Sequence, residues 1–221
     1  MTRLATAAML GMTALVLSGC GRQVYRATPP DLSTACVDNL AAVASRPLAY
    51  LEPKEKAQAR RVEFAAVAAC VRMEGTALPV ALYRLDALHE PSEIDVRIVL
   101  SEGGTFAASA EVLDANFQTL RRYGFSDFAR RTNEYSLSVF VDRRRPVAPT
   151  YLLLRPDPSQ VGGSDTAIAS QSSGFMLPGG GSYTYGTEVT RRRPLVGAGQ
   201  LQVVPYPVRP IGFETEDVPR G

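Results

Sequence analysis

The sequence is short of several residue types on which common enzyme sites depend. It contains no tryptophan, three cysteines, and a single histidine, His89. A serine triad needs an imidazole beside its nucleophile, but His89 lies in a proline-containing turn and the chain has no Gly-x-Ser-x-Gly element. Zinc needs several nitrogen or sulfur ligands, which one histidine and so few cysteines do not supply. The composition therefore predicts no metal, no cofactor and no enzyme activity.

An excess of charge of one sign is also missing, as is a long apolar run. The 24 basic residues, of which only Lys54 and Lys56 are lysine, nearly balance 22 acidic ones. Nucleic-acid-binding proteins carry a clear basic excess, so nucleic acid is not an expected partner. The apolar run from Leu4 to Leu17 follows Arg3 and is shorter than the roughly 20 residues of a membrane span. It is typical of a signal sequence, and no second run of spanning length follows.

The end of this run, Leu17-Ser18-Gly19-Cys20, resembles the bacterial lipobox. The resemblance implies that residues 1–19 are a signal peptide and that Cys20 is the first mature residue, carrying diacylglycerol on its thiol and a third acyl chain, such as palmitate, on its amine. Gly21 is not the aspartate associated with retention in the inner membrane. We therefore expect a lipid anchor at the periplasmic face of the outer membrane. The alternative is a secretory peptide that ends at a cysteine by chance.

Strand patterns dominate the chain from Leu78 onward. Apolar residues occupy every second position in residues 94–100 and 135–141, as in strands whose side chains alternate between two faces. Turn residues separate such runs, with little helical pattern between them. The sequence predicts a mainly β fold, an antiparallel β-sandwich of jelly-roll-like form. Further strands are expected at residues 106–113, 117–123, 151–154 and 201–204, and residues 61–73 fit helix or strand, with strand favoured.

A short N-terminal helix is the exception to this β pattern. Asp31 or Ser33 can cap it, and Cys36, Leu40 and Val43 recur at helical spacing. The predicted organisation is a linker at 20–32, a domain at 33–206 that contains a glycine- and serine-rich mobile loop at 160–181, and a proline-rich tail at 207–221.

The two cysteines that remain after Cys20 form a natural pair. Cys36 and Cys70 are an even number of thiols in an oxidising compartment, which favours a disulfide between them. The alternative is two buried free thiols.

Several stretches of the chain, in order and spacing, resemble the maltose operon periplasmic protein (MalM) family. The stretches are Cys36-Val37-Asp38-Asn39-Leu40 leading to Pro47-Leu48, Ala81-Leu82-Tyr83-Arg84-Leu85, Val112-Leu113-Asp114-Ala115-Asn116-Phe117, and residues 135–140, 182–186 and 199–204. The resemblance implies a periplasmic β-sandwich linked by operon context to maltodextrin uptake, and it implies no catalytic residues.

Arginine clusters are the strongest candidates for binding a partner. Because a guanidinium pairs bidentately with anionic groups, two clusters at one end of the domain would form a positive rim. The residues expected in this rim are Arg121, Arg122, Arg143, Arg144 and Arg145. The alternative for them is solubilising charge.

Two rival site types use other side chains. A sugar platform would need exposed aromatic faces, for which Tyr83, Tyr123, Tyr183 and Tyr185 are available. A glycoside hydrolase would need a carboxylate pair from among Glu93, Asp95, Glu102, Glu111 and Asp114. The sequence favours a non-enzymatic, outer-membrane-anchored accessory or interaction module in envelope or carbohydrate uptake. It leaves a carbohydrate-binding module and an envelope hydrolase as alternatives. We expect an envelope protein as partner, with a glycan as the alternative partner.

The Cys20→Ser variant tests the anchor. Without the thiol no acyl chain can be attached, so the variant should be misprocessed or released into the soluble fraction, whereas the wild type should fractionate with membranes. The intact mass of the mature wild type should include acyl chains. A soluble wild type of unmodified mass would refute the lipid anchor.

Overall fold

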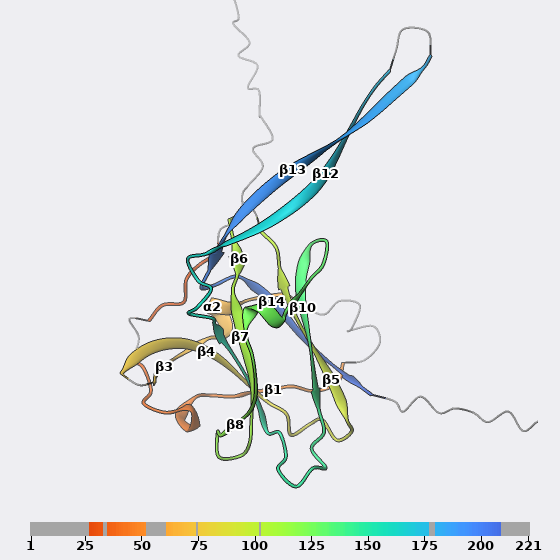
Figure 1. Ribbon diagram of the computed structural model, residues 1–221. Coiled ribbons are helices and arrows are strands. Elements are labelled where there is room, and N and C mark those ends of the chain that lie inside the picture. The colour runs from red at the N-terminus through yellow and green to blue at the C-terminus, as the bar shows by residue number, and fades with distance from the viewer. Residues whose placement is uncertain are drawn as a thin grey trace, which may run out of the picture.

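The computed structural model of the chain describes residues 27–32, 35–51, 61–73, 75–101, 103–176 and 180–208. The predicted signal peptide, Cys20 and the tail beyond Val208 lie outside these residues. The mainly β prediction is confirmed, since several antiparallel sheets make up most of the described chain (Figure 1). In this part of the chain, no helix is long and apolar enough to span a bilayer.

One sheet, called sheet 1, has the strand order β1-β4-β11-β7-β8, with β3 also paired to β4. The neighbours are antiparallel except β1 and β4, which are parallel. Residues 76–80 of β4 pair with β3, and residues 81–84 pair with β11. The bounds are β1 Arg46–Pro47, β3 Ala69–Met73, β4 Thr76–Arg84, β7 Ala108–Leu113, β8 Thr119–Tyr123 and β11 Tyr151–Pro156.

The second sheet, sheet 2, has the order β2-β14-β5-β10-β9, and all its neighbours are antiparallel. Its centre is β5, which pairs with β10 along its full length and with β14 over residues 92–98. The bounds are β2 Val62–Glu63, β5 Ser92–Val99, β9 Ala129–Arg130, β10 Glu134–Val141 and β14 Gln200–Pro207.

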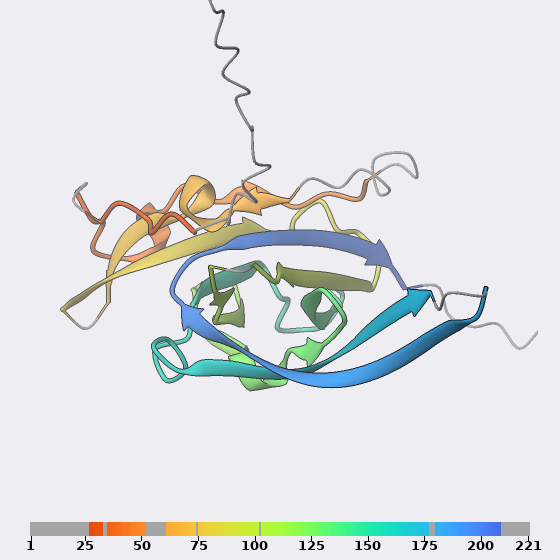
Figure 2. The ribbon, with the colours of Figure 1, turned by 90° about the horizontal axis from the view of Figure 1, so that it is seen from above.

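Side chains of both sheets form one apolar core. Figure 2 shows the ribbon of these sheets from above. Every second residue of β5 is buried, and Ile94, Val96 and Ile98 are fully so, as the alternation predicts. The short helix α2 (Phe64–Val67) adds Phe64, whose ring lies 4.7 Å from that of Phe106 in β6 (Thr105–Phe106). Each such side chain contributes about 1.5–3 kcal/mol when it is buried. Sheets 1 and 2 with this core are called the body.

Sheet 1 is also covered on its other face, by a smaller apolar cluster. Leu82 and Leu153 belong to this cluster, whereas their neighbours Ala81 and Leu152 belong to the main core. Val43 and the partly buried Val37 and Leu40, from the N-terminal segment, complete the cluster. The N-terminal segment therefore seals the outer face of sheet 1.

The short helix expected around Cys36 to Val43 is not found. The segment has only one 3-10 turn, η1 (Leu40–Ala42), capped by Asn39, whose Oδ1 accepts a hydrogen bond from the Ala42 amide at 3.0 Å. Before it, Val37 forms a parallel bridge to Val71 of β3. Pairing with a strand therefore outcompetes the weak helical pattern. Residues 61–73 contain both β2 and β3, as favoured, but the four residues of α2 lie between them.

The glycine- and serine-rich segment 160–181 was expected to be a mobile loop, but most of it is a strand. β12 (Ser164–Met176) pairs in antiparallel register with β13 (Ser182–Val196), from Ser164 opposite Pro194 to Met176 opposite Ser182. This hairpin, called the arm, projects from the body, and only its base joins β6, through Leu195 and Val196 (Figure 1). Backbone hydrogen bonding between the two strands forms this hairpin, although the polar composition gives no strand signal.

A buried carboxylate fixes the base of the arm to sheet 2. Asp165 of β12 is 8% exposed and accepts hydrogen bonds from Arg130 Nη1 at 2.6 Å and from the Tyr135 hydroxyl at 2.8 Å. The Tyr135 ring packs in turn against Phe125, with 4.8 Å between ring centroids. An ion pair between the arm and sheet 2 therefore holds the base of the arm against the body.

The Cys36–Cys70 disulfide is present, as predicted, and ties the N-terminal segment to β3. Because it closes a loop of 34 residues, it should stabilise the fold by about 2–4 kcal/mol, mainly by restricting the unfolded chain. Cys36→Ser combined with Cys70→Ser should lower the unfolding free energy by that amount in urea. A reducing agent should reproduce the loss in the wild type and leave the double variant unchanged; equal stability of both proteins would contradict the role.

Candidate functional site

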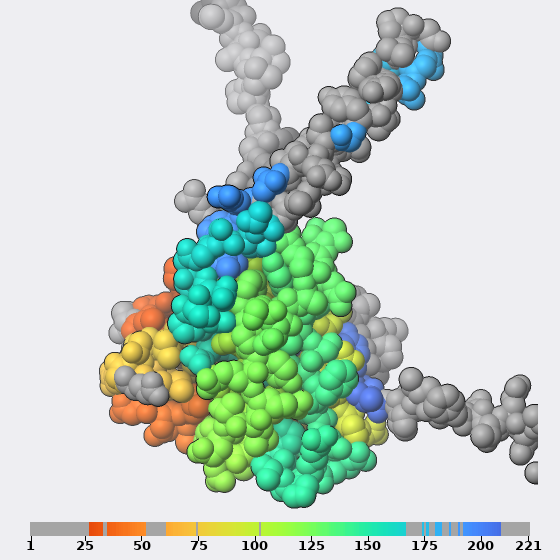
Figure 3. All heavy atoms as spheres, viewed as in Figure 1, coloured from red at the N-terminus to blue at the C-terminus, as the bar shows by residue number. Residues whose placement is uncertain are grey.

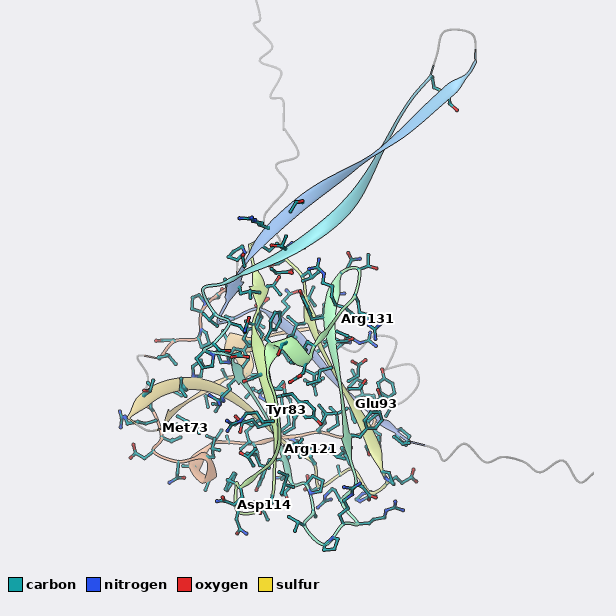
Figure 4. The ribbon with its side chains drawn as sticks, viewed as in Figure 1. Met73, Tyr83, Glu93, Asp114, Arg121 and Arg131 are labelled. Atoms are coloured by element: carbon teal, nitrogen blue, oxygen red, sulfur yellow. A yellow bond between two sulfur atoms is a disulfide. The ribbon has the colours of Figure 1, made fainter. Side chains whose placement is uncertain are left out.

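A groove of about 610 Å³ lies where the edge strands of the two sheets approach one another. Sheet 1 ends at β8, and β9 pairs with β10 only at Tyr135 and Ser136, so the rest of that edge of β10 has no strand beside it in the described chain. The guanidinium of Arg121, a residue of β8 that is labelled in Figure 4, donates to the Phe140 carbonyl of β10 and links the two edges. The groove thus occupies the gap between sheets 1 and 2.

The groove collects most of the large apolar side chains that the described surface exposes. Of seven such residues, four line it: Leu120 (37% exposed), Phe140 (53%), Val147 (56%) and Val208 (37%). Scattered apolar residues are normal on a protein surface, but a contiguous group in a concave site is typical of a binding site.

One wall of the groove is rigid. It contains Pro146 and Pro149 of the connection after β10, and Pro91 lies before β5. Proline has a fixed φ and lacks an amide donor, so these positions lose little conformational freedom on binding and offer an apolar surface. This connection lies at the end of the body opposite the arm, so the groove and the arm are well separated (Figure 3).

The charged side chains of the groove are Arg121, Arg145 and Asp142. Asp142 accepts bonds from Arg144 Nε at 2.9 Å and Nη2 at 3.1 Å, and these bonds lower its pKa to about 2. Asp142 is therefore ionised at neutral pH, with Arg144 balancing its charge. Arg145 has no ion pair with any described residue. The groove therefore presents a net positive charge to a ligand.

The five arginines of the predicted rim have different positions. Arg121 and Arg145 line the groove together, but Arg144 bonds Asp142, and Arg143 donates from Nη1 to the Asp86 carbonyl at 2.7 Å. Arg122 lies 3.3 Å from the Glu111 carboxylate. Arg121 and Arg122 also lie within β8 rather than in a turn. The structure thus brings two of the five together, and their partner binding stays a prediction.

The apolar lining was missed by sequence reasoning, although one signal was available. In β10 the inward positions Leu137, Val139 and Val141 are buried and alternate with outward ones. Ser136 and Ser138 occupy two outward positions, and the next is Phe140, a large aromatic residue where the pattern expects a polar one. That break in alternation marks the groove.

The described carboxylates considered for glycoside hydrolysis are each engaged by nearby groups. Glu93 accepts from Ser138 Oγ at 2.5 Å, and Asp95 pairs with Arg97 at 2.6 Å. Asp114 accepts from the amides of Asn116 and Gln118, each at 2.8 Å, and closes the β7–β8 turn. Glu102 lies outside the described residues. These contacts give each carboxylate a structural role.

Glu111 is the most enclosed of these carboxylates. It is 4% exposed and accepts bonds from Arg155 Nε at 3.1 Å and Nη2 at 2.9 Å, and from Thr119 Oγ1 at 3.0 Å. Burial raises its pKa, but the bonds from Arg155 and Thr119 outweigh burial and hold the pKa below its ordinary value of 4.5. Glu111 therefore stays ionised and clamps β7 to β8 and β11.

The remaining candidates form no binding centre. Tyr83 is buried, and burial raises its pKa to about 12, so its ring cannot stack on a sugar. Tyr123 is partly buried against the main core. Tyr183 and Tyr185 lie in β13, and His89 is exposed in its turn. Among the described residues, no three His, Cys, Asp or Glu side chains gather as metal ligands would.

No known protein family, curated protein or solved structure matches this chain. The resemblance to the MalM family therefore stays a prediction, and the site must be interpreted from its own geometry.

The pKa of Glu111 predicts a pH dependence of stability. Because the folded pKa lies below the unfolded one, the stability from Glu111 is present above about pH 4.5 and is lost as the pH falls through the folded value. Glu111→Gln should cost about 1–3 kcal/mol at pH 7, and this cost should shrink in acid. Urea titrations between pH 7 and 3 measure both, with exposed Glu90→Gln as control. A pH-independent cost would contradict the assignment.

Proposed function

We propose that this protein is a non-enzymatic β-sandwich lipoprotein at the periplasmic face of the outer membrane, and that its groove binds an extended segment of an envelope protein. The groove supports this proposal, because four exposed apolar side chains and two arginines converge between strand edges. The chemistry suits a segment with apolar side chains followed by acidic ones. The lipid anchor predicted at Cys20 would keep the module near envelope partners.

An extended polypeptide fits the groove better than a sugar does. Sugar sites use flat aromatic faces with several polar groups around them. Among the residues that the structure describes, the lining is mainly aliphatic and proline, and Phe140 is its one aromatic residue. An extended segment can lie along this edge of β10, because no described strand pairs with it beyond Ser136, and the Phe140 carbonyl there accepts from Arg121 instead. A role in carbohydrate uptake would then consist of contact with an uptake protein, not with the sugar.

Charge should contribute to this binding through two residues acting together. An exposed ion pair contributes only about 0–1 kcal/mol and is screened over about 8 Å at physiological salt. Reversal of both Arg121 and Arg145 converts two attractions into repulsions, which should weaken binding about tenfold or more. Binding should also decline as salt is raised.

Site-specific photocrosslinking in intact cells tests the proposal. A photoreactive residue at Val147, in the groove, should crosslink one envelope protein, and the crosslinked segment should contain apolar and acidic residues. The same residue at Val161, another exposed valine that lies outside the groove, is the matched control. Arg121→Glu with Arg145→Glu should remove the crosslink, and circular dichroism should show that the variant is still folded although it lacks the bond from Arg121 to the Phe140 carbonyl.

Arg131→Glu controls for the loss of positive charge, since this exposed arginine does not line the groove. It should leave the Val147 crosslink intact. Equal crosslinking from Val147 and Val161, or crosslinks that survive the double reversal, would refute the groove as the binding site.

A further inference from the structure

The described chain ends inside the groove. β14 finishes at Pro207, and the next residue, Val208, lines the groove while its amide donates to the Pro91 carbonyl at 2.8 Å. Residues 209–221 therefore start from a point that is already within the site.

The sequence of these residues complements the groove. Ile211 and Phe213 are apolar, and Glu214, Glu216 and Asp217 follow them closely. The groove offers apolar side chains beside two arginines in the same small volume. We infer that the groove binds residues 209–217 of its own chain, with Ile211 and Phe213 against the apolar lining and the acidic residues near Arg121 and Arg145.

The chain between Val208 and the docking residues is short enough for this contact to form within one molecule. Phe213 is five positions after Val208, and an extended chain of that length spans at most about 18 Å. Pro210 biases Arg209 toward extended conformations, which reduces the entropy lost on docking. A short tether also gives an effective concentration of about 1 mM, so even a weak intrinsic contact is largely formed.

Docking of the tail would regulate partner binding at the groove, so this inference rests on the proposed function. A partner segment has to displace residues 209–217, and the competition lowers its apparent affinity. With an effective concentration of about 1 mM and an intrinsic Kd of about 100 μM for the tail, the loss is about tenfold. The inference also specifies the partner chemistry, because a competing segment must have the same order of apolar and acidic side chains.

Tryptophan fluorescence of the full-length lipoprotein tests whether the tail docks. The chain has no tryptophan, so Phe213→Trp places the only indole within the segment. Its emission should be blue-shifted and protected from acrylamide, whereas Val218→Trp, beyond the acidic cluster, should emit as in water. Combining Phe213→Trp with Phe140→Asp, or with Arg121→Glu and Arg145→Glu, should restore a water-like spectrum. A water-like Phe213→Trp spectrum, or a blue shift that survives the groove variants, would overturn the inference.

A labelled peptide of residues 209–221 supplies a second measurement. Fluorescence anisotropy should show that it binds a variant truncated after Val208, and binds the full-length protein about tenfold more weakly because the tethered tail competes. Circular dichroism confirms that the truncated variant is folded. Equal affinity for both proteins, or none for either, would also overturn the inference.

These outcomes separate the two proposals. A water-like tail together with a groove-dependent crosslink at Val147 would reject tail binding and retain the partner site. A docked tail, with no crosslink at Val147 even after truncation at Val208, would retain tail binding and reject the partner site. If both hold, truncation should increase the Val147 crosslink.

Discussion

Burial of β5 between β10 and β14 is the constraint on which the rest of the structure depends. It places Ile94, Val96 and Ile98 in the core and fixes the register of β10 beside them. That register leaves Phe140 opposite Glu93 on the outward face. Because β9 covers only the start of β10, the remaining edge reaches the groove, where Arg121 and the prolines cover it. A free strand edge invites unwanted pairing, and charge and proline are the usual protection. The site is therefore a protected strand edge of sheet 2, the same sheet whose strand β5 forms the centre of the core.

Sequence patterns predicted those parts of the fold where burial creates the pattern. β5 and β10 alternate because one face of each is in the core, and residues 152–154 of β11 are apolar on both faces because sheet 1 is covered on both sides. The arm gave no such signal, since its order comes from backbone pairing between two polar strands rather than from burial. The expected N-terminal helix failed for a related reason, because pairing of Val37 with Val71 and the nearby disulfide override a weak local preference.

The candidate site was only partly predictable because neighbouring residues of a strand point in opposite directions. Arg121 and Arg122 are adjacent in sequence, yet one reaches the groove and the other approaches Glu111. The contact between Arg121 of β8 and Phe140 of β10 depends on how the two sheets pack together, which no local sequence pattern indicates. Phe140 carried a readable signal, as an aromatic residue in a polar position, but its meaning required the neighbouring edge of β8.

The distribution of compensated charge distinguishes the groove from the arm as a binding surface. At the base of the arm, the charge of Arg130 is neutralised by Asp165, with Tyr135 completing the contact, so an approaching partner would first have to break an internal pair. In the groove, Arg144 neutralises Asp142 instead, which leaves Arg145 and Arg121 to act on a ligand without the loss of an ion pair. An acidic segment gains more at the groove, because binding to Arg130 would also require breaking its pair with Asp165. These ion pairs thus favour the groove over the Arg130–Asp165 contact at the base of the arm.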